Sequence, residues 1–231
     1  MINNKKILAV IPARGGSKGI KLKNLKKINN KSLVSIAASF VKKCSFFDCS
    51  VISTDNDIIK KEAKKNKLTI IDRPKKLSGD KISDTSVLIH AVKKTERVLN
   101  SKFDVVVMLH PTSPLREKKD IKICVKRLIK KKLMSIWTIS ETDSKYHPHK
   151  QLILNKNKLS YFSNKGNKVV YRQQLNKIYH RNSAAYVINR NFLLKQKKLI
   201  GIKTEGHVIR KQQISIDNYE DLIKARKLFK N

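Results

Sequence analysis

Apolar and polar positions form two recurring patterns along the first 140 residues. Short, almost continuous apolar runs of strand length occur at 6–11, 49–54, 68–71, 103–109 and 134–139. Between them, apolar residues recur at the three- and four-residue spacing of a helix, at 32–44, 57–66, 83–99 and 118–131. In the third helix, the residues expected to face inward are Val87, Leu88, Ala91, Val92 and Val98. Strands that alternate with helices predict an α/β fold with a doubly wound, mostly parallel sheet.

The pattern changes after Thr142. Two short strands are predicted at 151–154 and 158–162, joined as a hairpin, and 140–175 is interpreted as an excursion from the main sheet. The segments 184–188 and 214–216 are predicted to be strands again. A last helix is predicted from Asn218 to Phe229, with Asn218 as its N-cap and Asp221 at position N3. We therefore expect 1–231 to form a single domain.

The loop at 14–18, with the sequence RGGSK, directly follows the first predicted strand. Its glycines let backbone N–H groups approach phosphate oxygens, and its arginine and lysine supply positive charge. The spacing is neither that of a Walker A loop nor that of G-x-G-x-x-G, so the loop alone indicates either a phosphate site or a simple turn. Ligands of doubly wound sheets bind beyond the carboxyl ends of the strands. The loops after Ile11, Thr54 and Leu109 are therefore expected to meet in one crevice.

Composition excludes several classes of protein. With 40% hydrophobic residues, the chain of 231 residues is neither disordered nor too short for a sizeable core. No apolar run approaches the roughly 20 residues needed to cross a bilayer, and the run near the N-terminus is too short for a signal peptide. We expect a cytoplasmic location without membrane attachment. The three cysteines form no C-x-x-C pair, so we expect reduced thiols and no structural zinc.

The formal net charge is +36, from 53 basic and 17 acidic residues. One interpretation is a surface that binds nucleic acid. The other is a lysine-rich composition spread over every solvated face. We favour the second and do not expect nucleic acid as a partner, because the basic residues follow the whole chain and no aromatic residues are interleaved with them. Such a surface would still attract a polyanionic nucleotide.

A longer string around the 14–18 loop resembles a family signature. Residues 11–24 read IPARGGSKGIKLKN, which is similar to the I-P-A-R-x-x-S-K-G-I/L-P-x-K-N of the CMP-sialic acid synthetases (acylneuraminate cytidylyltransferases). Lys21 stands where proline is usual. Further similar strings follow in the same order at 51–55, 73–77, 109–116, 171–175, 182–186 and 216–217. The resemblance therefore spans nearly the whole chain.

The resemblance implies a Rossmann-like nucleotidyltransferase fold with a dimerisation excursion, and hence a homodimer. It implies a reaction in which the anomeric hydroxyl of a nonulosonic (sialic-type) acid attacks the α-phosphate of CTP, which transfers CMP and releases pyrophosphate. The alternatives are a 3-deoxy-manno-octulosonate cytidylyltransferase, or a basic nucleic-acid-binding protein on a degenerate enzyme fold. Which acid is used, among N-acetylneuraminic, legionaminic and pseudaminic acid, stays open.

The resemblance also implies three groups of site residues. Those expected to take part in catalysis are Arg14, Lys23, His110 and Asp217. Those expected to bind CTP are Arg14, Gly15, Gly16, Ser17, Lys18, Lys23, Asn24, Arg73, Ser83 and Asp84. Those expected to bind the sugar are His110, Lys150, Arg172, Gln173, Asn182 and Tyr186, with Lys150 and Arg172 on its carboxylate. His110 stands where the family has glutamine, and it is either a general base or only a positioning residue.

The expected cofactor is Mg²⁺, with Mn²⁺ as a possible substitute. The family commonly carries D-I-D near the C-terminus as metal ligands, whereas this chain has Ser215-Ile216-Asp217. Residues two apart on a strand face the same side, so Ser215 and Asp217 are expected to point into one site. Mg²⁺ keeps several waters, so the Ser215 hydroxyl or a water that it holds could complete the shell around Asp217. A second departure is Tyr179-His180-Arg181-Asn182, where the family often has F-R-P-N.

Overall fold

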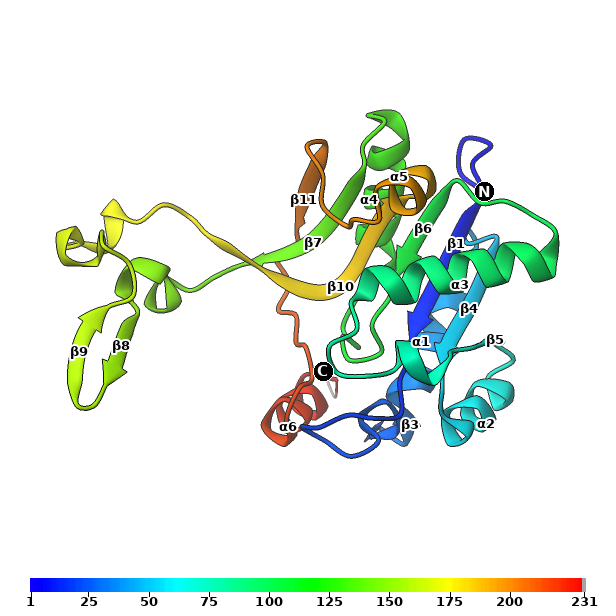
Figure 1. Cartoon of the computed structure of the whole chain (residues 1–231), viewed down its shortest axis with the longest axis horizontal. Coiled ribbons are helices and arrows are strands. Elements are labelled where there is room, and N and C mark those ends of the chain that lie inside the picture. The colour runs from blue at the N-terminus through cyan, green and yellow to red at the C-terminus, as the bar shows by residue number, and fades with distance from the viewer. Residues whose placement is uncertain (230–231) are drawn as a thin grey trace.

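A computed structural model describes residues 1–229 of the chain and shows one large mixed sheet with a projecting arm (Figure 1). The strand order is β11-β7-β10-β6-β1-β4-β5. The bounds are β1 (Ile7–Pro12), β4 (Cys49–Thr54), β5 (Thr69–Asp72), β6 (Val105–Met108), β7 (Ser135–Glu141), β10 (Tyr179–Asn189) and β11 (Thr204–Val208). Every neighbouring pair is parallel except those of β10, which runs antiparallel to both β6 and β7. The predicted α/β fold with a mostly parallel sheet is confirmed.

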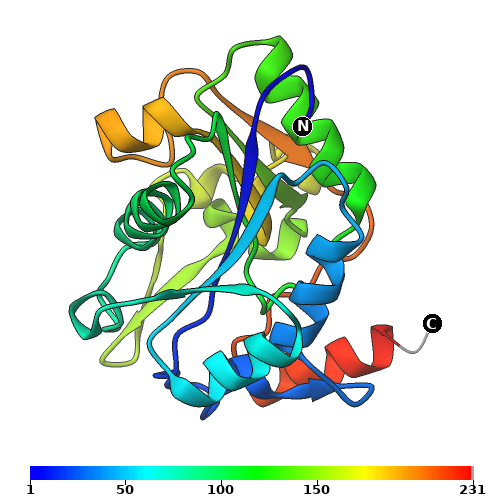
Figure 2. The ribbon, with the colours of Figure 1, turned by 90° about the vertical axis from the view of Figure 1, so that its right-hand side faces the viewer.

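Helices cover both faces of this sheet, as Figure 2 shows. Helices α1 (Leu33–Lys42), α2 (Asp57–Lys65) and α4 (Lys118–Lys130) lie on one face, and α3 (Asp84–Leu99) and α5 (Arg190–Gln196) on the other. Strand β1 explains why two layers are needed. Its residues Ile7, Ala9 and Ile11 belong to the core under α1 and α4, whereas Leu8 and Val10 belong to the core under α3. A central strand that is apolar on both faces must be covered on both.

The sequence pattern located α3 correctly but misjudged the end of its inward face. Val87, Leu88, Ala91 and Val92 are buried, as predicted, but Val98 is 61% exposed. Thr95 takes the next inward position, and its hydroxyl donates to the carbonyl of Ala91 at 2.7 Å. A threonine can be buried on a helix in this way because the backbone satisfies its polar group.

The C-terminal segment packs against the carboxyl edge of the sheet. Helix α6 (Tyr219–Leu228) has the predicted cap, in which the Asn218 side chain accepts from the Asp221 N–H at 2.9 Å and Asp221 accepts in return. The predicted strand at 214–216 is wrong, because this segment is extended but joins no sheet. It is held instead by a bond from the Ile216 N–H to the Thr112 carbonyl and by a small core around Ile216. The short ribbon β2 (Lys27–Ile28) and β3 (Lys31–Ser32) contributes to that core.

Besides the short ribbon of β2 and β3, two larger elements were missed by the sequence pattern. Edge strand β11 has the sequence TEGHV, which lacks an apolar run because it faces partly outward beside β7. Helix α5 spans only seven residues between β10 and β11, which is too short for a clear helical period. The last sheet strand of the chain is therefore β11, and β10 is much longer than the predicted 184–188.

The excursion from the sheet is an arm at 142–178, between β7 and β10 (Figure 1). It carries the predicted hairpin, β8 (Leu152–Asn155) paired with β9 (Lys158–Tyr161). It also carries the short 3-10 helices Ser144–Tyr146, Pro148–Lys150, Gly166–Lys168 and Arg172–Gln174, while two more lie in the body at Lys23–Leu25 and Lys75–Leu77. The hairpin residues are exposed on both faces, so within one chain this arm has nothing to pack against.

Candidate active site

A polar pocket of about 550 Å³ opens at the carboxyl edge of the parallel strands. It is formed by the loops after β1, β5 and β6, by β10 and by the segment at 215–217. Its lining includes Arg14, Ser17, Lys18, Gly19, Lys23, Asn24, Arg73, Asp80, Asp84, His110, Thr112, Ser183, Ser215 and Asp217. The loop after β4 supports it from behind, because Asp55 accepts a bond from the Gly15 N–H at 3.0 Å. Of the three loops predicted to meet in one crevice, those after β1 and β6 line the pocket, and the loop after β4 only contacts the first of them from behind.

Close packing sets the shape of the loop after β1. A Cβ atom on Gly15 would lie 2.6 Å from the Asn56 side chain, and one on Gly19 would collide with the backbone carbonyl of Asp217. Gly16 has open space around it instead. The buried Asn24 donates from Nδ2 to the Arg14 carbonyl at 3.0 Å. The loop is thus clamped at both ends, while its middle stays open to the pocket.

One carboxylate holds two cations of this loop. Arg14 Nη2 lies 2.9 Å from Asp80 Oδ1, and Lys18 Nζ lies 2.8 Å from Asp80 Oδ2. The bond from Lys18 and the charges of both neighbours lower the pKa of the Asp80 carboxyl. Asp80 therefore stays ionised and occupies the place that an anionic ligand would need. Sequence reasoning missed it, since a lone aspartate after Gly79 gives no local signal.

A second ion pair lies at the other side of the pocket. Lys23 Nζ is 2.7 Å from Asp217 Oδ1, and the Asp217 side chain is 72% exposed. Asp221 accepts from the Asp217 N–H at 2.9 Å and so fixes the backbone there. Ser215 lines the same wall, as the sequence predicted. In residues 1–229 there is no group of three His, Cys, Asp or Glu side chains that could hold a metal ion. A cation would need Asp217 together with ligands from a substrate and water.

Arg73 forms the wall beside β5 and is buried. It donates from Nε to the Ser53 hydroxyl at 3.1 Å and from Nη2 to the Ser53 carbonyl at 2.6 Å. Burial lowers the pKa of its guanidinium to about 10, so it remains charged at neutral pH. Ser83, predicted to contact CTP, is the N-cap of α3 and accepts from the Ser86 N–H. It does not line the pocket, whereas Asp84 does.

His110 stands at the end of β6, near the opposite wall. Its Nε2 is 3.6 Å from Asp84 Oδ2, an ion-pair distance rather than a hydrogen bond. Its ring meets the edge of Tyr186 at 5.5 Å between centroids, and Tyr186 stacks on Trp137 at 4.3 Å. Burial alone would raise the pKa of Asp84, but the adjacent His110 and the charges of two arginines lower it. Asp84 is thus a stable carboxylate beside the imidazole.

Comparison with known proteins decides the family. The cytidylyltransferase family model matches residues 8–230. The chain belongs to the cytidylyltransferase family. It is 29% identical over 227 residues to "Pseudaminic acid cytidylyltransferase" of Campylobacter jejuni, covering 97% of each chain. It is also 30% identical to "Post-translational flagellin modification protein B" of Campylobacter coli, covering 91% of this chain and 88% of the relative.

A solved structure of CMP:2-keto-3-deoxy-manno-octonic acid synthetase complexed with CTP superposes with a TM-score of 0.75. The two share 16% identity, and the match covers 97% of this chain and 98% of the other. At that identity the likeness concerns the fold, which is a Rossmann-like nucleotidyltransferase fold. Sequence similarity to cytidylyltransferases and this fold together make the chain a nucleotidyltransferase.

Three predicted sugar-binding residues lie away from the pocket of this cytidylyltransferase. Lys150, Arg172 and Gln173 belong to the arm, and none of them lines the pocket of its own chain. Arg172 borders a separate cavity of about 430 Å³ at the base of the arm. The prediction that they face the sugar is therefore not met within one subunit. The physical reason is that the arm turns outward instead of folding back over the sheet.

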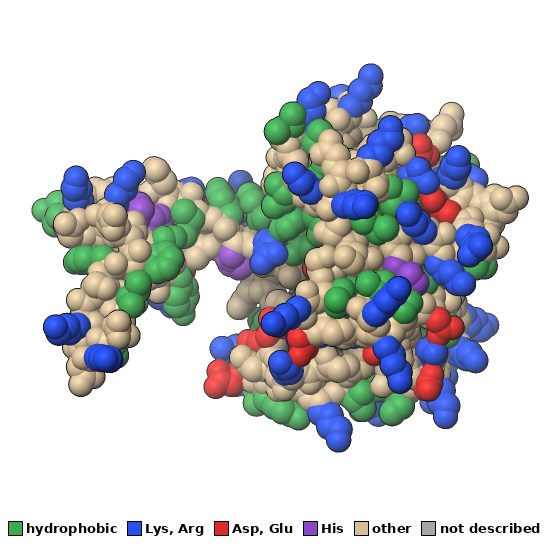
Figure 3. All heavy atoms as spheres, viewed as in Figure 1, with side chains coloured by type: hydrophobic (Ala, Val, Ile, Leu, Met, Phe, Trp, Pro, Cys, Tyr) green, Lys and Arg blue, Asp and Glu red, His purple; other side chains and the backbone are tan. Residues whose placement is uncertain are grey.

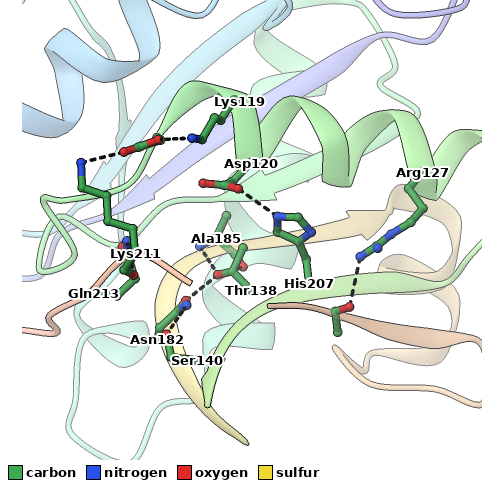
Figure 4. A network of polar contacts seen from close by, with 12 residues as sticks. Lys119, Asp120, Arg127, Thr138, Ser140, Asn182, Ala185, His207, Lys211 and Gln213 are labelled. Atoms are coloured by element: carbon green, nitrogen blue, oxygen red, sulfur yellow. Dashed lines mark hydrogen bonds and ion pairs between the residues drawn. The ribbon is translucent and has the colours of Figure 1, made fainter. Parts of the chain in front are cut away.

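Asn182 is also placed differently from its predicted role. It is buried, accepts at Oδ1 from the Thr138 hydroxyl at 2.7 Å, and donates from Nδ2 to the Ser140 hydroxyl at 3.1 Å (Figure 4). With these bonds made inside the sheet, its side chain holds β10 to β7 and does not line the pocket. Its neighbour Ser183 lines the pocket instead, and Tyr186 lies behind His110. We revise Asn182 from a sugar ligand to a residue that shapes the site.

Positive charge extends well beyond the pocket. In Figure 3, lysine and arginine side chains are scattered over the visible face of the body and the arm rather than gathered in one patch. This distribution agrees with the lysine-rich composition inferred from the sequence. Among the helices of residues 1–229, none is long and apolar enough to cross a membrane.

Proposed function

We propose that this cytidylyltransferase transfers CMP from CTP to the anomeric hydroxyl of a nonulosonic acid and releases pyrophosphate. The observation that carries the proposal is the order of groups along the pocket. Arg73 marks the β5 end, the loop with Arg14 and Lys18 lies in the middle beyond β1, and His110 and Ser183 mark the end at β6 and β10. Cytidine, triphosphate and sugar fit this order as one linear assembly.

The similarity to a relative named for pseudaminic acid supports the substrate class. It extends over 97% of both chains, whereas the 3-deoxy-manno-octulosonate alternative rests on a fold likeness at 16% identity. We therefore rank the nonulosonic acid first. Free thiols at Cys44, Cys49 and Cys124 are compatible with the cytoplasmic location that we also propose.

Catalysis at this site would depend on charge neutralisation and in-line positioning. In the proposed complex, Arg14 and Lys18 turn from Asp80 to the triphosphate, and the open backbone of Gly16 approaches its oxygens. Lys23 approaches the same phosphates from the side of Asp217. His110 holds the anomeric hydroxyl and, as the neutral imidazole, either accepts its proton or only orients it. The Asp84 carboxylate lies beside the ring and would stabilise positive charge on it.

We propose Mg²⁺ as the cofactor, with Mn²⁺ as a substitute. The residues present fit such an ion only in part, because Asp217 is an exposed carboxylate on the pocket wall and Ser215 adds one neutral oxygen. A hard cation that keeps several waters can bind to such a sparse set together with phosphate oxygens. When bound, Mg²⁺ would neutralise charge that develops on the transferring phosphate. Lys23 would then share Asp217 with the ion.

The test is a pyrophosphate-release assay with CTP and Mg²⁺ against N-acetylneuraminic, legionaminic, pseudaminic and 3-deoxy-manno-octulosonic acids. We expect turnover with at least one of the first three, and none with CTP alone. Turnover with the octulosonate only would establish the alternative substrate. No turnover with any acid, together with DNA binding that falls steeply with salt, would support the nucleic-acid alternative.

We further propose that the arm forms a homodimer. Leu152, Ile153, Leu154, Leu159, Tyr161 and Phe162 of the hairpin are each at least 45% exposed. Apolar residues gathered on a projecting arm are typical of an interface. In a symmetric dimer the arm of one subunit could bring Lys150 and Arg172 to the pocket of the other. This arrangement would reconcile their predicted role with their distance from their own pocket.

The dimer proposal predicts complementation between subunits. At an acid concentration well below KM, Lys150→Ala and Asp217→Asn proteins should each be nearly inactive, because one lacks the arm cation and the other lacks the pocket carboxylate. A mixture refolded or co-expressed at equal amounts should recover about a quarter of wild-type activity, since half of the dimers then hold one intact site. Each of Lys150→Ala and Arg172→Ala should raise KM for the acid far more than KM for CTP.

Light scattering at micromolar concentration gives the matching physical measurement. A dimer is expected for the wild type, and a monomer for a variant with Leu154→Ser and Leu159→Ser in the hairpin. A wild-type monomer, or a mixture of the two variants that stays inactive, would refute the assignment of the arm.

A further inference from the structure

Arg181 lies on β10 two residues before Ser183, which lines the pocket, although Arg181 itself does not. Strand β10 runs antiparallel to β6, and its Tyr186 pairs with Met108, the last residue of β6. Residues 181–183 therefore extend past the carboxyl end of β6, beside the loop that holds His110. Ser183 itself lines the pocket.

A β-bulge in β10 changes the direction of the chain at this point. Arg181 pairs with Ile139 of β7 and Tyr186 pairs with Trp137, so five steps along β10 oppose two along β7. Ser183 takes a left-handed conformation with φ of 57°, which is uncommon outside glycine. Asn182 anchors the bulge through Thr138 and Ser140 (Figure 4). Bulges often redirect side chains beside functional sites.

An aromatic chain supports the redirected side chain. The Arg181 guanidinium carbon lies 5.7 Å from the centroid of the Trp137 ring, in cation–π contact. Trp137 stacks on Tyr186, whose ring meets His110. The positive charge of Arg181 also contributes to the lowered pKa of Asp84, so it acts on a residue of the pocket wall. The neighbouring His180 instead contacts the Thr142 hydroxyl at the base of the arm, at 2.9 Å.

Arg181 differs from the other cations around the pocket in its charge partners. Arg14 and Lys18 are paired with Asp80, and Lys23 is paired with Asp217. Arg73 is buried on Ser53. Arg181 is exposed, and within residues 1–229 no carboxylate lies within ion-pair distance of it. Arg181 is thus a cation that its contact with Trp137 keeps in place and that can bind an anionic ligand.

We propose that Arg181 contributes to binding the carboxylate of the acid substrate from within the same subunit, alongside the arm cations that the dimer proposal brings from the other subunit, and so adds to the specificity for an acid sugar. The inference rests on the proposed function. An α-keto acid sugar carries its carboxylate on the anomeric carbon, next to the hydroxyl that must reach the α-phosphate. A guanidinium engages a carboxylate through two parallel bonds, which positions that carbon as well as neutralising the charge. His110 then lies on the hydroxyl side.

The experiment compares steady-state kinetics of Arg181→Ala and Arg181→Lys with the wild type, using whichever of the three nonulosonic acids the wild type turns over best. Arg181→Ala should raise KM for the acid at least roughly tenfold and change KM for CTP less than about twofold. Arg181→Lys should recover part of the loss, because it restores charge without the fork. The matched control is Arg210→Ala, an exposed arginine beside a different cavity. It should behave as the wild type.

A substrate change isolates the contact. The methyl ester of the same acid has no charge to recognise, so the wild type and Arg181→Ala should use it equally poorly. An Arg181→Ala protein with unchanged KM for the acid, or with KM for CTP raised as much, would overturn the proposal. The proposal would also be overturned if Arg181→Ala used the methyl ester much less well than the wild type does. That result would mark a purely structural role of Arg181 through its contact with Trp137. If the wild type turns over none of the acids, the proposed function itself fails instead.

Discussion

Replacing Asp217 with asparagine is expected to lower the rate at saturating CTP at least roughly a hundredfold, equivalent to about 2.7 kcal/mol of transition-state stabilisation. Asp217 is an exposed carboxylate on the pocket wall, and by the resemblance it is the one proposed metal ligand kept on the 215–217 segment. Asparagine has nearly the same shape but no charge. It would therefore weaken the anchor for Mg²⁺ and would also free Lys23 from its ion pair.

The measurement is a magnesium titration of three proteins at saturating CTP. The wild type should lose activity in EDTA and recover it with Mg²⁺ or Mn²⁺. Ser215→Asp should reach half-maximal rate at a lower magnesium concentration, because a second anionic ligand strengthens the site. Glu220→Gln, which removes one exposed charge from the first turn of α6, is the control and should follow the wild type. Full wild-type activity in EDTA, or a normal magnesium curve for Asp217→Asn, would contradict this account.

The second large effect is expected from Arg14→Ala, which should lower kcat/KM for CTP at least roughly tenfold, or about 1.4 kcal/mol. Two causes act in the same direction. The triphosphate loses a guanidinium, and Asp80 loses one of the two cations that neutralise it. A carboxylate with only Lys18 beside it would repel the incoming phosphates.

A double-mutant cycle separates these two causes. Asp80→Asn alone should tighten CTP binding, because Arg14 and Lys18 no longer have to leave an internal anion. Adding Asp80→Asn to Arg14→Ala should recover part of the lost kcat/KM. Strict additivity would show that Asp80 does not compete with the nucleotide. Unchanged kinetics in Arg14→Ala would remove Arg14 from the site.

Sequence similarity and apolar periodicity anticipated most of the body because both depend on local information. An uninterrupted apolar strand such as β1 must be buried on two faces, which predicts the layered sheet without knowledge of its neighbours. The N-cap at Asn218 could also be predicted from the sequence, because a helix cap involves residues only three positions apart. The pocket residues that follow strands directly, such as Arg14 and His110, were located by the same reasoning.

Elements and contacts that depend on partners far away in the chain could not be inferred in this way. The sequence of β11 has no apolar run that would identify it as a strand. It forms a strand because it pairs with β7, which lies almost 70 residues earlier in the chain. The Arg14–Asp80 and Lys23–Asp217 pairs join residues that are 66 and 194 positions apart, so no local sequence pattern predicts them. The antiparallel direction of β10 was likewise invisible to periodicity.

The sequence by itself indicated the family by resemblance and the alternation of strands and helices in the first 140 residues, because both are properties of short segments. Only the tertiary structure decided which side chains share the pocket. It turned Asn182 into the sheet, carried Lys150 and Arg172 outward on the arm and placed the Arg181 guanidinium over Trp137. The physical reason is that a side chain's direction depends on strand register and on a three-residue bulge, and both are set by pairing between distant strands.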